Sequence, residues 1–166
     1  MKTPFMINSD FLFSLSLIKG AYHTLPVYYL WPLSTENATL LCHDCNGKKS
    51  GTWPSKFYSD AQLRRLSILT GIDYNLLSGE PQYNPKAIEA LHDPEIVDSL
   101  LTKFAAYMDE VIKLRNRIFI DTGFDFFTVS KTISDAYVQK AYRMLRSSRI
   151  ETEMSKLMAG KNSKEK

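Results

Sequence analysis

Apolar residues recur every three or four positions after Asp93, which is the spacing of a helix with one buried face. The start is marked by Asp93, Pro94 and Glu95, because an aspartate caps a first turn and proline and an acid are favoured within it. The apolar positions that follow are Ile96, Val97, Leu100, Leu101, Phe104, Met108, Val111 and Ile112. This pattern predicts one helix that runs to about residue 120, before Gly123.

Four other segments have helical signals that are shorter or weaker. Ser59 and the following aspartate form an N-cap for a helix that Gly71 ends. Short helices are predicted over 73–77 and 85–91, between turns rich in proline, glycine and asparagine. Ser134 begins a last helix, which carries apolar residues and several arginines.

The N-terminal third has a different pattern, which predicts two short strands over 21–25 and 37–42. Pro26 and Pro32 bracket an aromatic loop between them. Residues 42–46 predict a turn, and a short helix follows that ends by Gly51 or Pro54.

These elements predict an α+β protein in which a strand–loop–strand–turn–helix unit precedes helices. We divide the chain into a lead-in over 1–20, the compact unit over 21–58, a helical region over 59–159 and a disordered tail over 160–166.

Composition is that of an ordinary globular protein, with 44% apolar and 23% charged residues among 166. The net charge of +3 permits nucleic-acid binding but does not argue for it. Two cysteines only two residues apart make a disulfide framework improbable and favour a reduced, cytoplasmic setting. The apolar run over 11–18 is shorter than the roughly 20 residues that a membrane span needs, so no membrane association is expected.

The candidate chemistry lies between His23 and Lys49, where the order is histidine, Asn37, Cys42-His-Asp-Cys45 and Asn46. A neutral imidazole can accept a proton from water near pH 7, because its ordinary pKa is about 6.5. Each residue alone also has a structural interpretation. A lone histidine is more often part of a core or a surface, and Asn-Gly is a common turn dipeptide.

The whole order resembles the ββα-metal motif of HNH nucleases in its His-Asn-Asn form. The segment from Asn46 to Tyr58, with its Trp-Pro-Ser sequence, is similar to bacterial HNH restriction endonucleases, and the similarity extends over about 22–92. The resemblance implies a small ββα-metal unit followed by helices, and a metal-dependent DNA endonuclease, either a restriction enzyme or a fragment of one.

The resemblance also implies a role for each site residue. His23 would activate water, Asn37 would orient it, and Asn46 would hold Mg²⁺ or Mn²⁺. Lys49 is placed to meet a phosphate, and Arg64 and Arg65 are the preferred DNA contacts. Double-stranded DNA is therefore the expected partner. A homodimer is also reasonable, with the apolar stripe after Pro94 as its interface.

Tyr22 departs from the family pattern, which has a metal-binding acid before the histidine. Either another acid, such as Asp10 or Asp44, completes the metal site, or the chain is a catalytically impaired DNA-binding or regulatory relic. A strand lost by truncation upstream would also explain the departure.

Cys42 and Cys45 would supply half of a structural zinc site, which needs four ligands in a tetrahedron. No second CxxC pair is present, so the set is incomplete. A zinc-binding interaction domain and a pair of unmetallated cysteines both stay open as interpretations.

Overall fold

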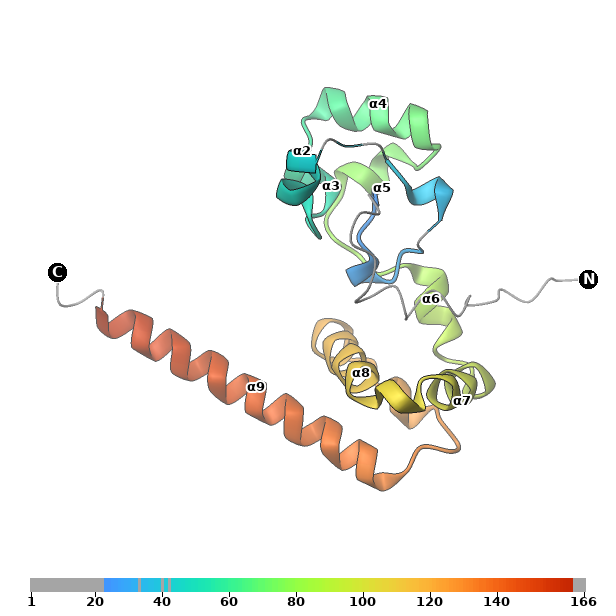
Figure 1. Ribbon diagram of the computed structural model, residues 1–166, viewed down its shortest axis with the longest axis vertical. Coiled ribbons are helices and arrows are strands. Elements are labelled where there is room, and N and C mark those ends of the chain that lie inside the picture. The colour runs from blue at the N-terminus through green and yellow to red at the C-terminus, as the bar shows by residue number, and fades with distance from the viewer. Residues whose placement is uncertain (1–22, 33, 40, 42, 163–166) are drawn as a thin grey trace, which may run out of the picture. The chain divides into compact units, whose positions relative to one another are not determined.

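The computed structural model describes residues 23–32, 34–39, 41 and 43–162, with the side chains of 35 and 153–162 left aside. The chain forms two compact units, Met1–Ile88 and Glu89–Lys166. The structure is 69% helical, and its described part contains no strand. Figure 1 shows the helices of each unit. The unit boundary lies well after residue 58, where the sequence segmentation placed the end of the compact unit.

The predicted α+β fold with a ββα unit is wrong, because the two expected strands are reduced to one isolated antiparallel bridge between His23 and Ala38. The 3-10 helices η1 (Val27–Tyr29) and η2 (Thr35–Asn37) lie between the two bridge residues. The side chain of Asn37 bonds both the N–H and the carbonyl of Leu25. A strand ladder needs those backbone groups, so the pairing cannot extend past the bridge.

The first unit is built from short helices that follow the bridge. They are α2 (His43–Lys49), α3 (Pro54–Phe57), α4 (Asp60–Thr70), α5 (Tyr74–Ser78) and α6 (Pro85–Ala90), the last of which reaches the unit boundary. Helix α5 packs against α3 and α4. The core they enclose consists of Leu25, Trp53, Leu63, Leu66 and Leu77.

Three helix boundaries in this unit follow the local sequence signals. Gln62 accepts hydrogen bonds from the backbone N–H and the hydroxyl of Ser59, which starts α4 as predicted. Gly71 ends α4 with φ of 71°, a left-handed conformation that costs glycine little. The carboxylate of Asp73 accepts the first free N–H groups of α5. These predictions are confirmed.

The predicted turn over 42–46 is wrong in its described part, because α2 already begins at His43. Cys45 and Asn46 therefore lie on a helix, whereas Cys42 lies outside the described residues. Asp44 stands in the first turn of α2, where an acid is favoured by the helix dipole.

The second unit contains α7 (Pro94–Lys103), η3 (Ala105–Tyr107), α8 (Met108–Thr122), η4 (Phe126–Thr128) and α9 (Asp135–Asn162). The helix start at Asp93 and the stop at Gly123 are confirmed, but the single helix predicted between them is wrong. The chain leaves the α-helical conformation at Phe104, passes through η3 and resumes it at Met108, and the side chains of Phe104 and Met108 stay buried. Because the apolar spacing continues across the break, the pattern gives no sign of it.

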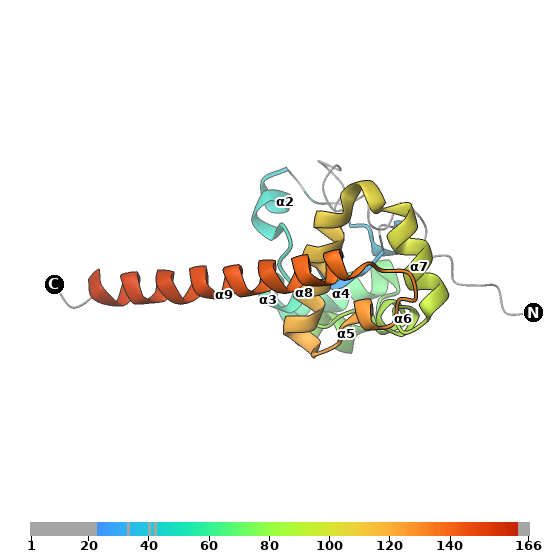
Figure 2. The ribbon, with the colours of Figure 1, turned by 90° about the horizontal axis from the view of Figure 1, so that it is seen from below.

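Helix α9 packs on α8 with its first half and then continues beyond it, as Figures 1 and 2 show. Asn116 donates a hydrogen bond of 2.9 Å to the carbonyl of Ala141 at this contact. Residues 146–152 of α9 are exposed, and its backbone is helical to Asn162, inside the predicted tail. A search of the described helices finds none that is both long and apolar enough to span a membrane.

Candidate functional site

Asn37 fixes the segment that carries His23. Its side chain is 4% exposed, and its Oδ1 accepts from the N–H of Leu25 at 2.7 Å. Its Nδ2 donates to the carbonyls of Leu25 at 2.8 Å and Pro32 at 3.0 Å. The Thr24 N–H donates to the Asn37 carbonyl at 2.7 Å. The amide therefore connects the two ends of the aromatic loop.

His23 is half-buried, and both of its ring nitrogens are shielded from solvent without a hydrogen-bond partner in the described structure. Burial lowers the pKa of the imidazole below 6.5, and the nearby positive charge of Lys49 lowers it further. The ring is therefore neutral at pH 7, which is the form that can accept a proton.

Lys49 lies at the end of α2 and is 2% exposed, whereas Lys48 beside it is exposed. Its Nζ donates to the carbonyl of His23 at 2.8 Å and to the carbonyl of Thr52 at 3.4 Å. Burial lowers the pKa of Lys49 to about 8. A phosphate contact, as the sequence predicts, would require Nζ to leave both carbonyls.

Asn46 lies on the same helix, one turn before Lys49, and is partly buried. Cys45 is exposed, and burial together with the neighbouring Cys45 raises the pKa of Tyr58. The second cysteine of the proposed zinc pair, Cys42, lies outside the described residues, as do Tyr22 and Asp10.

The described residues fit a divalent cation incompletely. Magnesium prefers carboxylate and carbonyl oxygens, and among the predicted ligands Asn46 offers one amide oxygen. Within the described ranges, no group of three or more His, Cys, Asp or Glu side chains could hold a metal ion. Asp44, suggested as a substitute acid, is exposed at the start of α2 and lies within reach of His43.

The two arginines preferred for DNA contact lie on α4. Arg64 pairs with Asp60 at 2.9 Å and lies 4.5 Å from the ring centroid of Tyr74, in a solvent-exposed arrangement. Arg65 is also exposed on the same helix. Exposed ion pairs exchange partners at little cost, so both side chains are accessible to a phosphate.

Arg115 is fully buried in the second unit. Its guanidinium pairs with Asp125 and bonds Asn116 at 2.9 Å, and it lies over the ring of Phe119. The Arg115 guanidinium is therefore not accessible to a phosphate. Its position, three residues after Ile112 on the apolar face of the helix, is the sequence signal that indicates burial.

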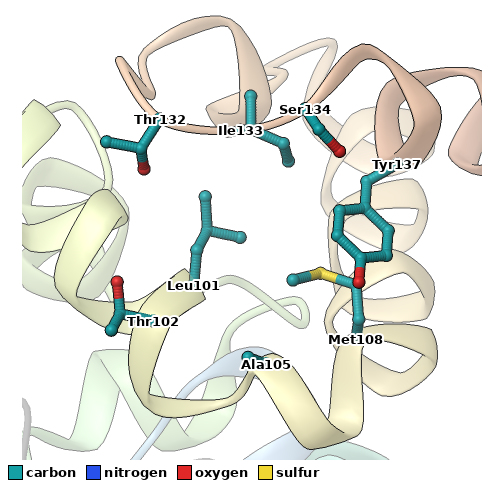
Figure 3. A pocket seen from close by; sticks show the side chains of 8 residues that line it. All are labelled: Leu101, Thr102, Ala105, Met108, Thr132, Ile133, Ser134 and Tyr137. Atoms are coloured by element: carbon teal, nitrogen blue, oxygen red, sulfur yellow. The ribbon is translucent and has the colours of Figure 1, made fainter.

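A shallow cavity of about 280 Å³ lies in the second unit, between the α7–α8 junction and the segment before α9. Figure 3 shows Leu101 and Met108 facing it from one side and Ile133 from the other, with Tyr137 at its edge. Tyrosine is the one titratable type among its lining residues, so the cavity offers little for acid–base chemistry.

Comparisons with known proteins do not identify a family, since no family model, curated protein or solved structure matches this chain.

Proposed function

We propose that this chain is a DNA endonuclease that hydrolyses phosphodiester bonds, with His23 as the general base. The observation that carries the proposal is the neutral imidazole of His23, which has no hydrogen-bond partner among the described residues and stands on a segment tied down by Asn37. The similarity of the His-Asn-Asn order to HNH restriction endonucleases supports the choice of DNA as substrate.

The proposed reaction requires one imidazole nitrogen of His23, which is shielded in the structure, to become accessible to water. That nitrogen then takes a proton from water as the water oxygen attacks phosphorus. A new phosphorus–oxygen bond forms, and the bond to the leaving sugar oxygen breaks. That oxygen takes a proton from bulk water, and the imidazolium then returns its proton to the solvent. General base catalysis of this kind contributes about 10²- to 10⁴-fold to a rate. Asn37 acts through the backbone of Leu25, because it keeps the adjoining segment in one conformation.

The resemblance also implies a divalent cation, which would neutralise charge on the phosphate. Asn46 is the described residue proposed to contact it, and the remaining oxygens would have to come from elsewhere in the chain or from water. No step of the reaction above is assigned to the ion.

A plasmid-nicking assay in Mg²⁺ or Mn²⁺ tests the activity. We expect the wild-type chain to convert supercoiled DNA to the nicked form, and His23→Ala to lower the rate by about 10²-fold or more. The matched control is His43→Ala, because the side chain of His43 is 99% exposed and has no role in the proposal. Chelation of the cation should stop nicking. Equal rates for the wild type and His23→Ala would reject the proposal.

A second function is favoured by the shielding of the imidazole nitrogens and the inward direction of the Lys49 ammonium. Both features suit a structural role, as in a DNA-binding relic that no longer cleaves. This candidate predicts that duplex DNA binds, measured by fluorescence anisotropy, while no nicking occurs with either cation. Arg64→Ala and Arg65→Ala together should then weaken binding and reduce its salt dependence.

The homodimer expected from the stripe after Pro94 loses its proposed interface, because Val97, Leu100 and Leu101 are buried in the core of the second unit. Sedimentation of the full chain would show whether another surface pairs two copies.

A further inference from the structure

We infer that Lys49 is a positioning residue for His23: its ammonium holds the His23 backbone carbonyl and sets a fixed positive charge beside the imidazole. The inference rests on the proposed role of His23 as a base, and it assigns to Lys49 a role different from the predicted phosphate contact.

The ammonium of Lys49 points toward two backbone carbonyls. Lys49 is 2% exposed, and its Nζ lies 2.8 Å from the carbonyl oxygen of His23 and 3.4 Å from that of Thr52. The three residues come from the bridge segment, the end of α2 and the turn after it. One side chain therefore ties the backbone of the proposed base to the helix that carries Asn46.

A second tie holds the other end of the same segment. Asn37 bonds the backbone of Leu25, two residues after His23, and between these two contacts the Thr24 N–H donates to the Asn37 carbonyl at 2.7 Å. The His23–Leu25 segment is thus held at both ends by buried polar side chains. Such double attachment fixes the backbone from which the imidazole projects, which is part of what a general base requires.

The charge of Lys49 adds an electrostatic effect to the mechanical one. A positive charge close to an imidazole disfavours the imidazolium form, so the ring gives up its proton at a lower pH. Burial is the larger cause of the lowered pKa of His23, and Lys49 is the charged group that acts with it. Lys49 itself, with its pKa lowered to about 8, is still mainly protonated at pH 7. The base is therefore available at a pH where an exposed histidine would be partly charged.

The test is a ¹H–¹³C NMR titration of the imidazole groups in the full chain without DNA. The chain has three histidines, so the loss of one signal in His23→Gln assigns it. We expect the His23 midpoint below 6.5 in the wild type and at higher pH in Lys49→Met. The matched control is Lys48→Met, which removes the same charge from the preceding residue, whose side chain is exposed. Coincident midpoints for the wild type and Lys49→Met would overturn the inference.

A measurement on the unmodified chain covers the case in which Lys49→Met does not fold. The ¹³Cε signal of Lys49 should titrate near pH 8, well before an unperturbed lysine. A Lys49 midpoint near 10.5 would show that the buried contact is absent and would also reject the inference.

Activity separates this inference from the proposed function. Where nicking is observed, the acidic limb of its pH–rate profile should move to higher pH in Lys49→Met and stay in place in Lys48→Met. A chain that does not nick DNA rejects the proposed function, while the NMR midpoints still decide whether Lys49 acts on His23.

Discussion

Asn37 and Leu25 are joined by a pair of hydrogen bonds in which one side-chain amide replaces a strand partner. The Oδ1 of Asn37 accepts from the Leu25 N–H at 2.7 Å, and its Nδ2 donates to the Leu25 carbonyl at 2.8 Å. The residues are twelve positions apart, and the amide is buried. This contact limits the predicted strand pair to a single bridge and fixes the backbone next to His23.

Replacing Asn37 with alanine should lower the free energy of unfolding of the first unit by about 2–4 kcal/mol. The change removes three hydrogen bonds and leaves buried backbone groups of Leu25 unsatisfied, at about 1–3 kcal/mol for each such group. Urea unfolding, monitored by tryptophan fluorescence, measures this loss of stability, because Trp31 and Trp53 both lie in this unit. The control, Asn75→Ala, changes an exposed asparagine of α5. A loss below about 0.5 kcal/mol for Asn37→Ala would contradict the prediction.

The lowered pKa of His23 predicts that the first unit gains stability as pH rises toward neutrality. The unfolded chain binds the proton more tightly than the folded one, so folding is disfavoured below the folded pKa and the penalty is relieved as pH rises to about 6.5. Urea midpoints recorded from acidic to neutral pH should rise in the wild type and rise less in His23→Gln. Parallel curves for the two proteins would contradict this.

Lys49 should cause a second rise in the stability of the first unit, at higher pH. Its pKa falls from 10.5 in the unfolded chain to about 8 in the folded one, so the unfolded state again binds more protons between these values. The gain on going from pH 8 to pH 10.5 is at most roughly 3 kcal/mol. Because tyrosines also titrate near the upper limit, the measured quantity is the difference between the wild type and Lys49→Met. That difference should change between pH 8 and 10, and a constant difference would count against the buried ammonium.

Arg115 and Asp125 form a buried ion pair that should dominate the stability of the second unit. Arg115→Ala leaves the Asp125 carboxylate 9% exposed and without its main partner, which should cost about 3–5 kcal/mol. The double variant Arg115→Met with Asp125→Leu should lose less, because it buries no unpaired charge. Far-UV circular dichroism during thermal unfolding measures both, with the exposed Arg146→Ala as control. A double variant less stable than Arg115→Ala would contradict the argument.

The Asp98 carboxylate on α7 should stabilise one loop locally, without a large effect on the stability of the whole unit. Its carboxylate accepts hydrogen bonds from the hydroxyls of Ser130 and Thr132 and from the N–H of Lys131. These bonds, that of Ser130 above all, lower the pKa of Asp98, so they stabilise the loop above the ordinary carboxyl pKa and are lost as pH falls through the folded pKa. Asp98→Asn should speed hydrogen exchange over 130–133, while Glu95→Gln on the same helix should not. Unchanged hydrogen exchange over 130–133 in Asp98→Asn would contradict this role of Asp98.

Local sequence is enough to predict the helix ends that depend on near neighbours. Ser59 with Gln62, Gly71, Asp73, and Asp93 with Pro94 act over four residues or fewer, so their effect is contained in the local sequence. The order of His23, Asn37 and Asn46 also placed the candidate site in one short part of the chain.

Long-range packing, in contrast, sets which polar side chains are buried and which backbone groups they bond. Lys49 reaches the carbonyl of His23 across 26 positions, and Asn37 reaches Leu25 across twelve, so neither contact has a local signature. Lys48 and Lys49 look alike in sequence, and the direction in which α2 faces the bridge segment decides that one is exposed and the other buried. The break at Phe104 likewise keeps the apolar period, so it is set by packing on both of its sides.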